Sequence, residues 1–365
     1  MGAIQYRRDL SPARISFTRC WRFQLSNWSL FIYCCWAFLA SIAFLCWGPS
    51  LSRSVGFYRC DTDLEKRYWH EQFAEKPLFT VLVLSARNSF DKREGIRLTW
   101  VKHTGRYVFL IGDEPCSIPP KYRKEWTCSL ANDSILVPPL EQEVYDFTMQ
   151  TESALLAREA TLHNDIALLP MVDYYRALPH KVKLGFSWAL QHAQAQWVVK
   201  TDDDSYFVAS EADKLLSTLD PTEMTIVGHI ERDESVPRSG KWAEYPEYKP
   251  NIYPPFPNGA NGYTVSLRVA QYIADYDGFE YQGEDVSVGI WLDRSPCVVT
   301  WLHSELFVPD GDCRNTSRIV IGHNISPLKM KQCYEFNQNQ LGKNAPPSGW
   351  NLGEGELRSK KAVKQ

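Results

Sequence analysis

An uncharged apolar run between Trp28 and Trp47 constrains this chain more than any other feature. The run reads WSLFIYCCWAFLASIAFLCW, and a helix of that length spans about 30 Å, the thickness of a bilayer core. Only one acid, Asp9, precedes it, together with five arginines: Arg7, Arg8, Arg14, Arg19 and Arg22. Basic residues favour the cytoplasmic side of a membrane, so we predict one transmembrane helix whose amino end stays in the cytoplasm.

Two other interpretations of this run are weaker. A cleaved signal peptide has an apolar core of about 7–15 residues and a small-residue cleavage site, which WGPSLSRS imitates poorly. A buried core helix would carry a polar face, and none interrupts the run. The expected organisation is therefore a cytoplasmic tail (1–27), an anchor (28–47), a polar stem (48–76), a luminal domain (77–340) and a disordered tail (341–365).

The composition of the chain excludes some classes of function. Forty Lys and Arg residues against 43 Asp and Glu residues give a net charge of −3, unlike the strongly basic balance of nucleic-acid-binding proteins. We therefore expect no nucleic-acid partner. Six cysteines follow the anchor, an even number that permits disulfides but leaves their pairing open. Three sequons, at Asn132, Asn315 and Asn324, are glycosylation acceptors if this part is luminal.

The apolar pattern after Pro77 predicts an α/β fold. Three short apolar runs of the buried-strand type occur at 78–84, 107–111 and 197–199. Helix-like segments at 152–162 and 181–194 lie between the second and the third run. This alternation predicts a mainly parallel sheet, and the segment 244–258, rich in Pro and Tyr, predicts a long loop of the functional kind.

Three consecutive carboxylates follow the third predicted strand. In extended backbone Asp202 and Asp204 share one face while Asp203 points away. Ligands of open α/β sheets bind beyond the carboxyl ends of the strands, and two carboxylates suit Mg²⁺ or Mn²⁺. The alternative is a solvated turn, but apolar residues flank the acids on both sides. We therefore predict a site for a metal ion and a diphosphate.

A second acidic pair, Glu284 and Asp285, opens a segment with apolar residues at 286, 288, 290 and 292. Acids at a helix start interact favourably with the helix dipole, and by itself this structural explanation would suffice. The two residues are adjacent, so their side chains are expected to point in different directions.

Taken in order, these clusters and their neighbours resemble the β-1,3-glycosyltransferase family of Golgi galactosyltransferases and N-acetylhexosaminyltransferases. The similarity covers about residues 77 to 335 and departs from the family pattern at Pro179 and at Gly259-Ala-Asn-Gly262. The motifs that carry it are Ser85 to Asn88, Arg93 to Trp100, Asp165-Ile166, Asp173 to Tyr175, Lys181, Trp188, Lys200 to Asp204, Gly262-Tyr263 and Glu284 to Gly289.

The resemblance implies a GT-A fold, a UDP-sugar donor, Mn²⁺ and inversion at the anomeric carbon. It implies Asp285 as the general base and Asp202, Asp204 and His323 as the metal site. Arg87, Arg93, Arg97, Lys181, Lys200 and Asp203 are expected to bind the donor, although Arg97 could equally brace the fold beneath Trp100. Asn261, Gly262, Tyr263 and Glu284 are expected to form the sugar pocket.

These observations together predict a single-pass type II enzyme of the Golgi membrane. Its luminal domain would transfer Gal, GlcNAc or GalNAc from a UDP-sugar to a hydroxyl of a glycoprotein, proteoglycan or glycolipid glycan, in β-1,3 linkage. One alternative is a catalytically silent, glycan-binding protein on the same fold. The other is a metal-dependent phosphohydrolase, which should place His or further Asp residues beside the aspartate triplet, and none occurs there.

Overall fold

The computed structural model describes residues 63–73, 76–193, 195–309, 313 and 319–344. The predicted anchor, the cytoplasmic tail and the carboxyl-terminal tail from 345 onward lie outside these residues, as do 48–62 of the stem. No helix within the described ranges is both long enough and apolar enough to span a membrane. The described part belongs to one compact unit, residues 59–365.

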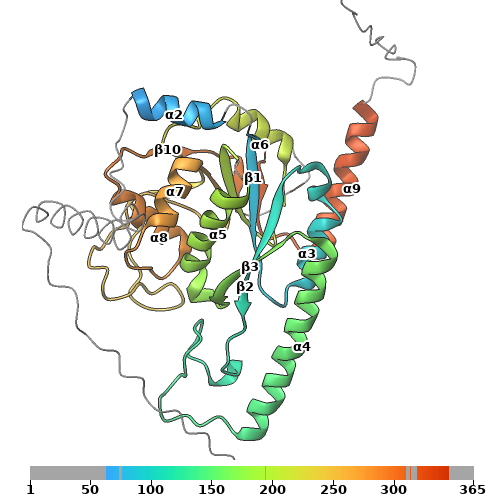
Figure 1. The fold of residues 1–365 in the computed structure, drawn as a ribbon, viewed down its shortest axis with the longest axis vertical. Coiled ribbons are helices and arrows are strands. Elements are labelled where there is room, and N and C mark those ends of the chain that lie inside the picture. Colours follow the sequence, from blue (N-terminus) through green and yellow to red (C-terminus); the bar gives the residue numbers. More distant parts are fainter. Residues whose placement is uncertain (1–62, 74–75, 194, 310–312, 314–318, 345–365) are drawn as a thin grey trace, which may run out of the picture. The chain divides into compact units, whose positions relative to one another are not determined.

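Eight helices of the described part surround the strands (Figure 1). They are α2 (Asp63–Phe73), α3 (Phe90–Arg97), α4 (Pro139–His163), α5 (Leu178–His192), α6 (Ala209–Leu216), α7 (Leu267–Asp275), α8 (Glu284–Asp293) and α9 (Pro327–Asn344). Helix α2 falls within the predicted polar stem, 48–76. Its last residue, Phe73, is buried.

Twelve strands form three sheets within the described residues. The main sheet has seven strands in the order β10-β6-β9-β4-β1-β2-β3. The strands are β1 (Phe79–Leu84), β2 (Tyr107–Glu114), β3 (Ile166–Val172), β4 (Trp197–Asp202), β5 (Tyr206–Phe207), β6 (Thr225–Gly228), β7 (Ile230–Glu231), β8 (Phe256–Pro257), β9 (Tyr263–Ser266), β10 (Thr300–His303), β11 (Phe307–Val308) and β12 (Ile321–Gly322).

The prediction of a mainly parallel α/β sheet is confirmed. Strand β1 pairs in parallel with β2 and β4, and β2 pairs in parallel with β3. Only β9 runs the other way in the main sheet, antiparallel to β4 and β6. The carboxyl ends of β1 and β4 therefore meet at one edge, where Leu84 lies opposite Asp202.

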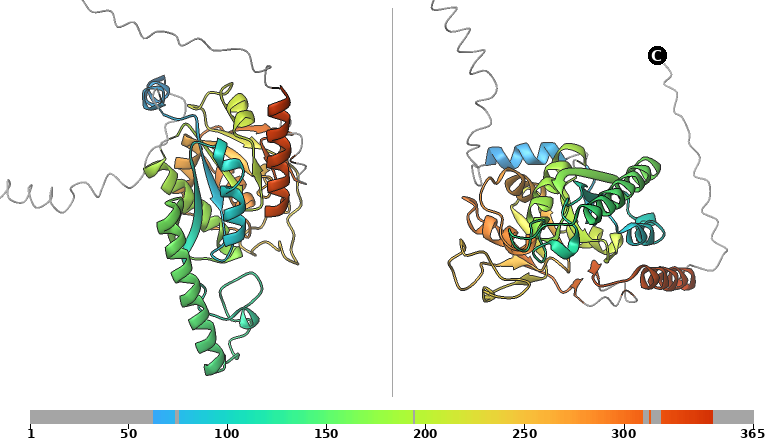
Figure 2. Two further views of the ribbon diagram at one scale, coloured as in Figure 1. Left: turned by 90° about the vertical axis from the view of Figure 1, so that its right-hand side faces the viewer. Right: turned by 90° about the horizontal axis from the view of Figure 1, so that it is seen from below.

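Helices cover both faces of the main sheet (Figures 1 and 2). Helices α5, α7 and α8 pack together on one face, and α3 packs against α9 on the other. Helix α4 extends beyond the sheet, with the segment that follows β2 lying alongside its projecting end. The predicted long loop, 244–258, is also present, interrupted only by β8 and by an isolated bridge at Ile252.

Disulfides close two segments of the described chain. Cys116 pairs with Cys128, and Cys313 pairs with Cys333. Cys297 is disulfide-bonded as well. The cysteines after the anchor therefore do form disulfides, and the structure supplies pairings that the sequence left open.

Candidate functional site

The aspartate triplet lies where β4 ends, and its side chains diverge as extended backbone requires. Asp202 and Asp204 face one point together with His323, and their nearest ligand atoms all lie within 4.8 Å of one another. Asp203 points elsewhere, and its carboxylate accepts hydrogen bonds from Ser85 Oγ at 2.8 Å and Lys92 Nζ at 2.9 Å. The predicted convergence of Asp202 and Asp204 is confirmed.

His323 reaches this point from a separate small sheet. It follows β12, which pairs with β5, and β5 in turn follows the aspartate triplet along the chain. The backbone amide of Ile325 donates to the carbonyl oxygen of Asp204 at 2.7 Å, which ties the two segments together. The sheet therefore brings together residues more than a hundred positions apart.

The chemistry of this cluster fits a divalent cation. Asp204 Oδ1 is buried and has no hydrogen-bond partner among the described residues. His323 Nε2 lies 3.5 Å from that oxygen, while His323 Nδ1 lies 3.3 Å from the carbonyl oxygen of Pro309. A ring nitrogen held by a backbone carbonyl fixes the imidazole so that the other nitrogen can bind a metal ion. Two carboxylates and an imidazole suit Mn²⁺.

Two clefts meet at the cluster. The first, of about 510 Å³, is lined by residues of the β1–α3 connection and by all three aspartates. The second, of about 680 Å³, is lined by the long loop and by Glu284 and Asp285. Asp202, Asp204 and His323 line both clefts. A ligand in each cleft would therefore approach the same point from two sides.

The first cleft carries basic side chains. Lys92 Nζ bridges Asp203 at 2.9 Å and Asp204 at 3.2 Å, and these carboxylates raise the pKa of Lys92 although burial acts against them. Lys181 Nζ lies 2.8 Å from Asp173 in the cleft floor, where burial lowers the pKa of Lys181. Arg87 also lines the cleft, and its guanidinium donates to Glu152 of α4 at 2.9 Å.

Lys92 is a cleft residue that sequence reasoning missed. It lies in α3, directly before the Arg93 to Trp100 motif on which the resemblance rests. Its position next to that motif is the one feature of the sequence that could have pointed to it. Whether a helical lysine turns toward the carboxylates depends on how α3 packs on the sheet.

Arg93 and Arg97 do not line either cleft, which corrects the expectation that they bind the donor. Arg93 is fully buried, and its guanidinium lies 2.7 Å from Glu159 of α4. Arg97 pairs with Glu159 at 2.6 Å and with Asp165 at 2.8 Å. The alternative role, in which Arg97 braces the fold, fits this ion-pair network.

Lys200 lines the second cleft rather than the first. Its buried ammonium contacts Asp202 at 2.9 Å and Glu284 at 2.6 Å, and it donates to the carbonyl oxygen of Gly259 at 2.8 Å. One lysine thus links the metal-site strand to the start of α8. Burial raises the pKa of Glu284 to about 7 despite this partner.

Glu284 and Asp285 point in different directions, as expected for adjacent residues at the start of α8. Glu284 is directed at Lys200, whereas Asp285 accepts hydrogen bonds from the amides of Val286 at 2.8 Å and Gly259 at 3.3 Å. Burial raises the pKa of Asp285, and the two amides oppose that rise. The pKa of Asp285 therefore lies above the ordinary value of an aspartate.

Gly259 permits this close approach. An added Cβ would lie 2.5 Å from Glu284 Oε1 and 3.1 Å from Asp285 Cβ. Any larger residue would displace the two acids. The absence of a side chain at Gly259 therefore shapes the second cleft directly.

The remaining predicted pocket residues lie behind the clefts, which is a second correction. Asn261 is fully buried and donates to the carbonyl oxygen of Phe307 at 3.4 Å. Tyr263 is also fully buried in β9. Gly262 has a φ of +70°, and an added Cβ there would lie 2.7 Å from the backbone oxygen of Lys200. These three residues support the site without lining it, whereas Asn258, Gly259 and Ala260 do line the second cleft.

The sequons fall in different surroundings. Asn132 and Asn324 are exposed, and Asn324 directly follows His323. Asn315 lies outside the described residues. Glycosylation of all three stays a prediction.

Part of the described domain is similar to known proteins. Residues 147–299 match the family model described as Galactosyltransferase. This range contains the aspartate triplet and the start of α8, whereas β1, Lys92 and His323 lie outside it.

Named glycosyltransferases are similar to parts of the chain of different length. UDP-GalNAc:beta-1,3-N-acetylgalactosaminyltransferase 2 of Xenopus tropicalis is 33% identical over 157 residues, which cover 42% of this chain and 32% of that protein. The Homo sapiens protein of that name is 34% identical over 148 residues, covering 40% and 29%. Hydroxyproline O-galactosyltransferase GALT2 of Arabidopsis thaliana is 27% identical over 256 residues, covering 68% and 33%. The chain thus spans about a third of the length of these relatives.

Proposed function

We propose that this chain is an inverting glycosyltransferase with a GT-A fold, because residues 147–299 match the galactosyltransferase family model. It moves Gal, GlcNAc or GalNAc from a UDP-sugar to a sugar hydroxyl and forms a β-1,3 linkage. The observation that carries the proposal is the meeting of two clefts at Asp202, Asp204 and His323, with Asp285 in the second cleft alone.

The first cleft is the proposed donor site. Lys92 and Lys181 supply positive charge near the floor, where a diphosphate would lie. Asp202, Asp204 and His323 would hold Mn²⁺, which, when bound, neutralises the charge of the departing UDP as a Lewis acid. The unpartnered Asp204 Oδ1 supports this assignment, because a buried carboxylate oxygen without a partner is costly.

The second cleft is the proposed acceptor site. Asp285 accepts the proton of the attacking hydroxyl, and its hydrogen bonds to the amides of Val286 and Gly259 hold the carboxylate in place. Donor and acceptor enter from different clefts, so the hydroxyl attacks the anomeric carbon from the side opposite UDP. That arrangement favours inversion.

We further propose that the enzyme is a type II protein of the Golgi membrane, with the described domain in the lumen. The uncharged run 28–47 and the arginines before it support this placement, and so do the disulfides of the described domain. The natural acceptor would be a glycan on a glycoprotein, proteoglycan or glycolipid.

A donor screen tests the function. Full-length protein in detergent micelles is incubated with UDP-Gal, UDP-GlcNAc or UDP-GalNAc, Mn²⁺ and a panel of β-linked sugar acceptors, and the released UDP and the product linkage are measured. We expect one donor to give acceptor-dependent UDP release and a β-1,3 product. Saccharide binding without transfer from any donor would favour the silent glycan-binding alternative instead.

A further inference from the structure

An aromatic cluster stands at the rim of the second cleft. Trp126, Tyr175 and Trp242 surround the ammonium of Lys241, which lies 4.8 Å from the ring centres of Trp126 and Tyr175 and 5.4 Å from that of Trp242. The rings of Trp126 and Tyr175 are 5.4 Å apart. Tyr175, Lys241 and Trp242 line the cleft that contains Asp285. We call these four residues the rim platform.

The rim platform is assembled from three distant segments. Tyr175 follows β3, and Lys241 and Trp242 lie in the segment between β7 and β8. Trp126 belongs to the segment between β2 and α4, and its carbonyl oxygen accepts from the amide of Arg176 at 3.0 Å. The guanidinium of Arg176 donates to the carbonyl oxygens of Lys241 and Ala243, both at 3.1 Å. Hydrogen bonds from the amide and the guanidinium of Arg176 therefore fix these segments against one another.

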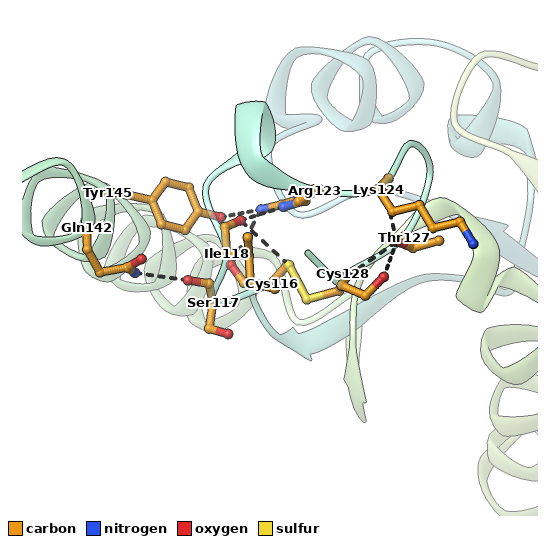
Figure 3. The surroundings of a disulfide bond; sticks show 10 residues. Cys116, Ser117, Ile118, Arg123, Lys124, Thr127, Cys128, Gln142 and Tyr145 are labelled. Atoms are coloured by element: carbon orange, nitrogen blue, oxygen red, sulfur yellow. Dashed lines mark hydrogen bonds between the residues drawn. A yellow bond between two sulfur atoms is a disulfide. The ribbon is translucent and has the colours of Figure 1, made fainter. Parts of the chain in front are cut away.

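A disulfide holds the Trp126 segment in shape (Figure 3). Cys116 and Cys128 close it, and Tyr145 of α4 donates its hydroxyl to the carbonyl oxygen of Cys116 at 2.7 Å while accepting from Arg123. Trp126 itself has a φ of +67°, which is rare for a bulky residue. Such an outlier persists only where the surrounding structure imposes it, and it points to a function for the side chain.

The rings are too exposed to serve the core. Trp126, Tyr175 and Trp242 keep 38%, 36% and 57% of their surface accessible. Lys241 Nζ makes no hydrogen bond or ion pair with any side chain or backbone group of the described residues, so its three N–H donors remain available. Aromatic faces carry a partial negative charge and attract the C–H bonds of a sugar ring, while an ammonium can donate to sugar hydroxyls.

We propose that the rim platform binds the acceptor saccharide, with a sugar ring stacked on Trp242 or Trp126 and its hydroxyls bonded by Lys241. This inference rests on the proposed function and specifies its acceptor side. It assigns a specificity role to the disulfide-closed segment 116–128, whose Trp126 contacts the cleft residue Lys241.

Acceptor kinetics test the proposal. Full-length wild type, Trp126→Ala and Trp242→Ala are compared with methyl β-galactoside and methyl β-N-acetylglucosaminide as acceptor probes. We expect each variant to raise the acceptor KM about tenfold, because losing one stacking ring weakens binding by roughly 1.4 kcal/mol. The donor KM and UDP affinity should not change, and Trp→Tyr at the same positions should restore most of the loss.

Phe147→Ala is the matched control, because Phe147 is an exposed aromatic residue of α4 outside both clefts. Saturation-transfer NMR with the same two probes measures binding without turnover. An unchanged acceptor KM in both variants of an active enzyme would overturn the platform and leave the proposed function standing. Binding signals that vanish in the variants of an enzyme without transferase activity would support the platform and overturn the function. A wild type that neither transfers to nor binds the probes would overturn both.

Discussion

Asp204 is the residue on which the metal assignment depends most directly. Its Oδ1 atom is buried, has no hydrogen-bond partner among the described residues, and faces His323. We expect Asp204→Ala to abolish Mn²⁺-dependent UDP binding, because removing one of few oxygen ligands leaves the diphosphate charge uncompensated. Calorimetric titration of UDP in the presence of Mn²⁺ measures this, and chelation of the metal should reproduce the loss in wild type.

Asp213→Ala provides the control for that experiment, since Asp213 is an exposed acid of α6 that lines neither cleft. The control should bind UDP as wild type does. UDP affinity that is equal in Asp204→Ala and wild type would exclude Asp204 as a ligand.

The two possible roles of Asp285, general base and helix cap, predict mutational effects of very different size. Loss of a positioned general base costs about 10²–10⁴-fold in rate, whereas loss of a charge at a helix start costs only about 0.3–1 kcal/mol of stability. Asp285→Asn should therefore lose nearly all transfer while keeping UDP affinity and its melting temperature. Initial-rate assays and thermal unfolding check both. Transfer within about tenfold of wild type would place the base elsewhere.

The pH dependence of turnover gives a second prediction for Asp285. A base acts in its deprotonated form, and burial raises the pKa of this carboxyl above its ordinary value of 3.8. Turnover should consequently fall on acidification at a higher pH than an exposed aspartate would require. Rate profiles between pH 4 and pH 8 measure it, with UDP binding followed in parallel to exclude loss of the donor. A rate that stays constant down to the range of an ordinary aspartate would contradict the assignment.

At the scale of elements, helix α4 is held against α3 by ion pairs more than by apolar packing. Only Leu156 of this helix is buried, whereas Glu159 pairs with both Arg93 and Arg97 of α3. Burial alone would raise the pKa of Glu159, but the two arginines outweigh it and the pKa is lowered from 4.5. The ion pairs therefore stabilise the fold at neutral pH.

Glu159→Gln should lower the free energy of unfolding by about 3 kcal/mol at pH 7, because it leaves the buried Arg93 without a partner charge and removes one of the two partners of Arg97. The lowered pKa fixes the sign of the pH dependence. The stabilising contribution of the Glu159 ion pairs is present above the unfolded-state pKa of about 4.5. It is lost as the pH falls through the lower pKa that Glu159 has in the folded state. Urea unfolding at pH 7 and at pH 3.5 should show a difference between variant and wild type that shrinks in acid. A difference that is equal at both pH values would argue against an ionic role.

For the whole molecule, membrane topology is the prediction that decides where the enzyme works. Five arginines before the uncharged run and mixed charges after it predict that the amino end stays in the cytoplasm. In intact microsomes we expect added protease to remove only the amino-terminal tail, leaving the remainder protected until detergent is added. Asn132→Gln should also reduce the apparent mass by one glycan. A protected tail, or a mature chain that begins after Trp47, would refute this topology.

The sequence by itself determined β1, β2 and β4 of the seven strands in the main sheet, the α/β class and the shared face of Asp202 and Asp204. Each of these follows from backbone periodicity, which acts over a few residues and does not depend on what packs nearby. The different directions of the Glu284 and Asp285 side chains also follow from local backbone geometry, because adjacent residues of a helix point to different sides of it.

Only the tertiary structure decided which side chains meet. Arg93 and Lys92 are neighbours in α3, yet one is buried against Glu159 and the other faces the aspartates. Asn261 lies behind the cleft that Gly259 shapes, two positions away. Trp126 reaches Tyr175 and Lys241 because a disulfide and the bonds of Arg176 hold three loops together. Such contacts join residues far apart in the chain, and their geometry is set by packing that no local pattern encodes.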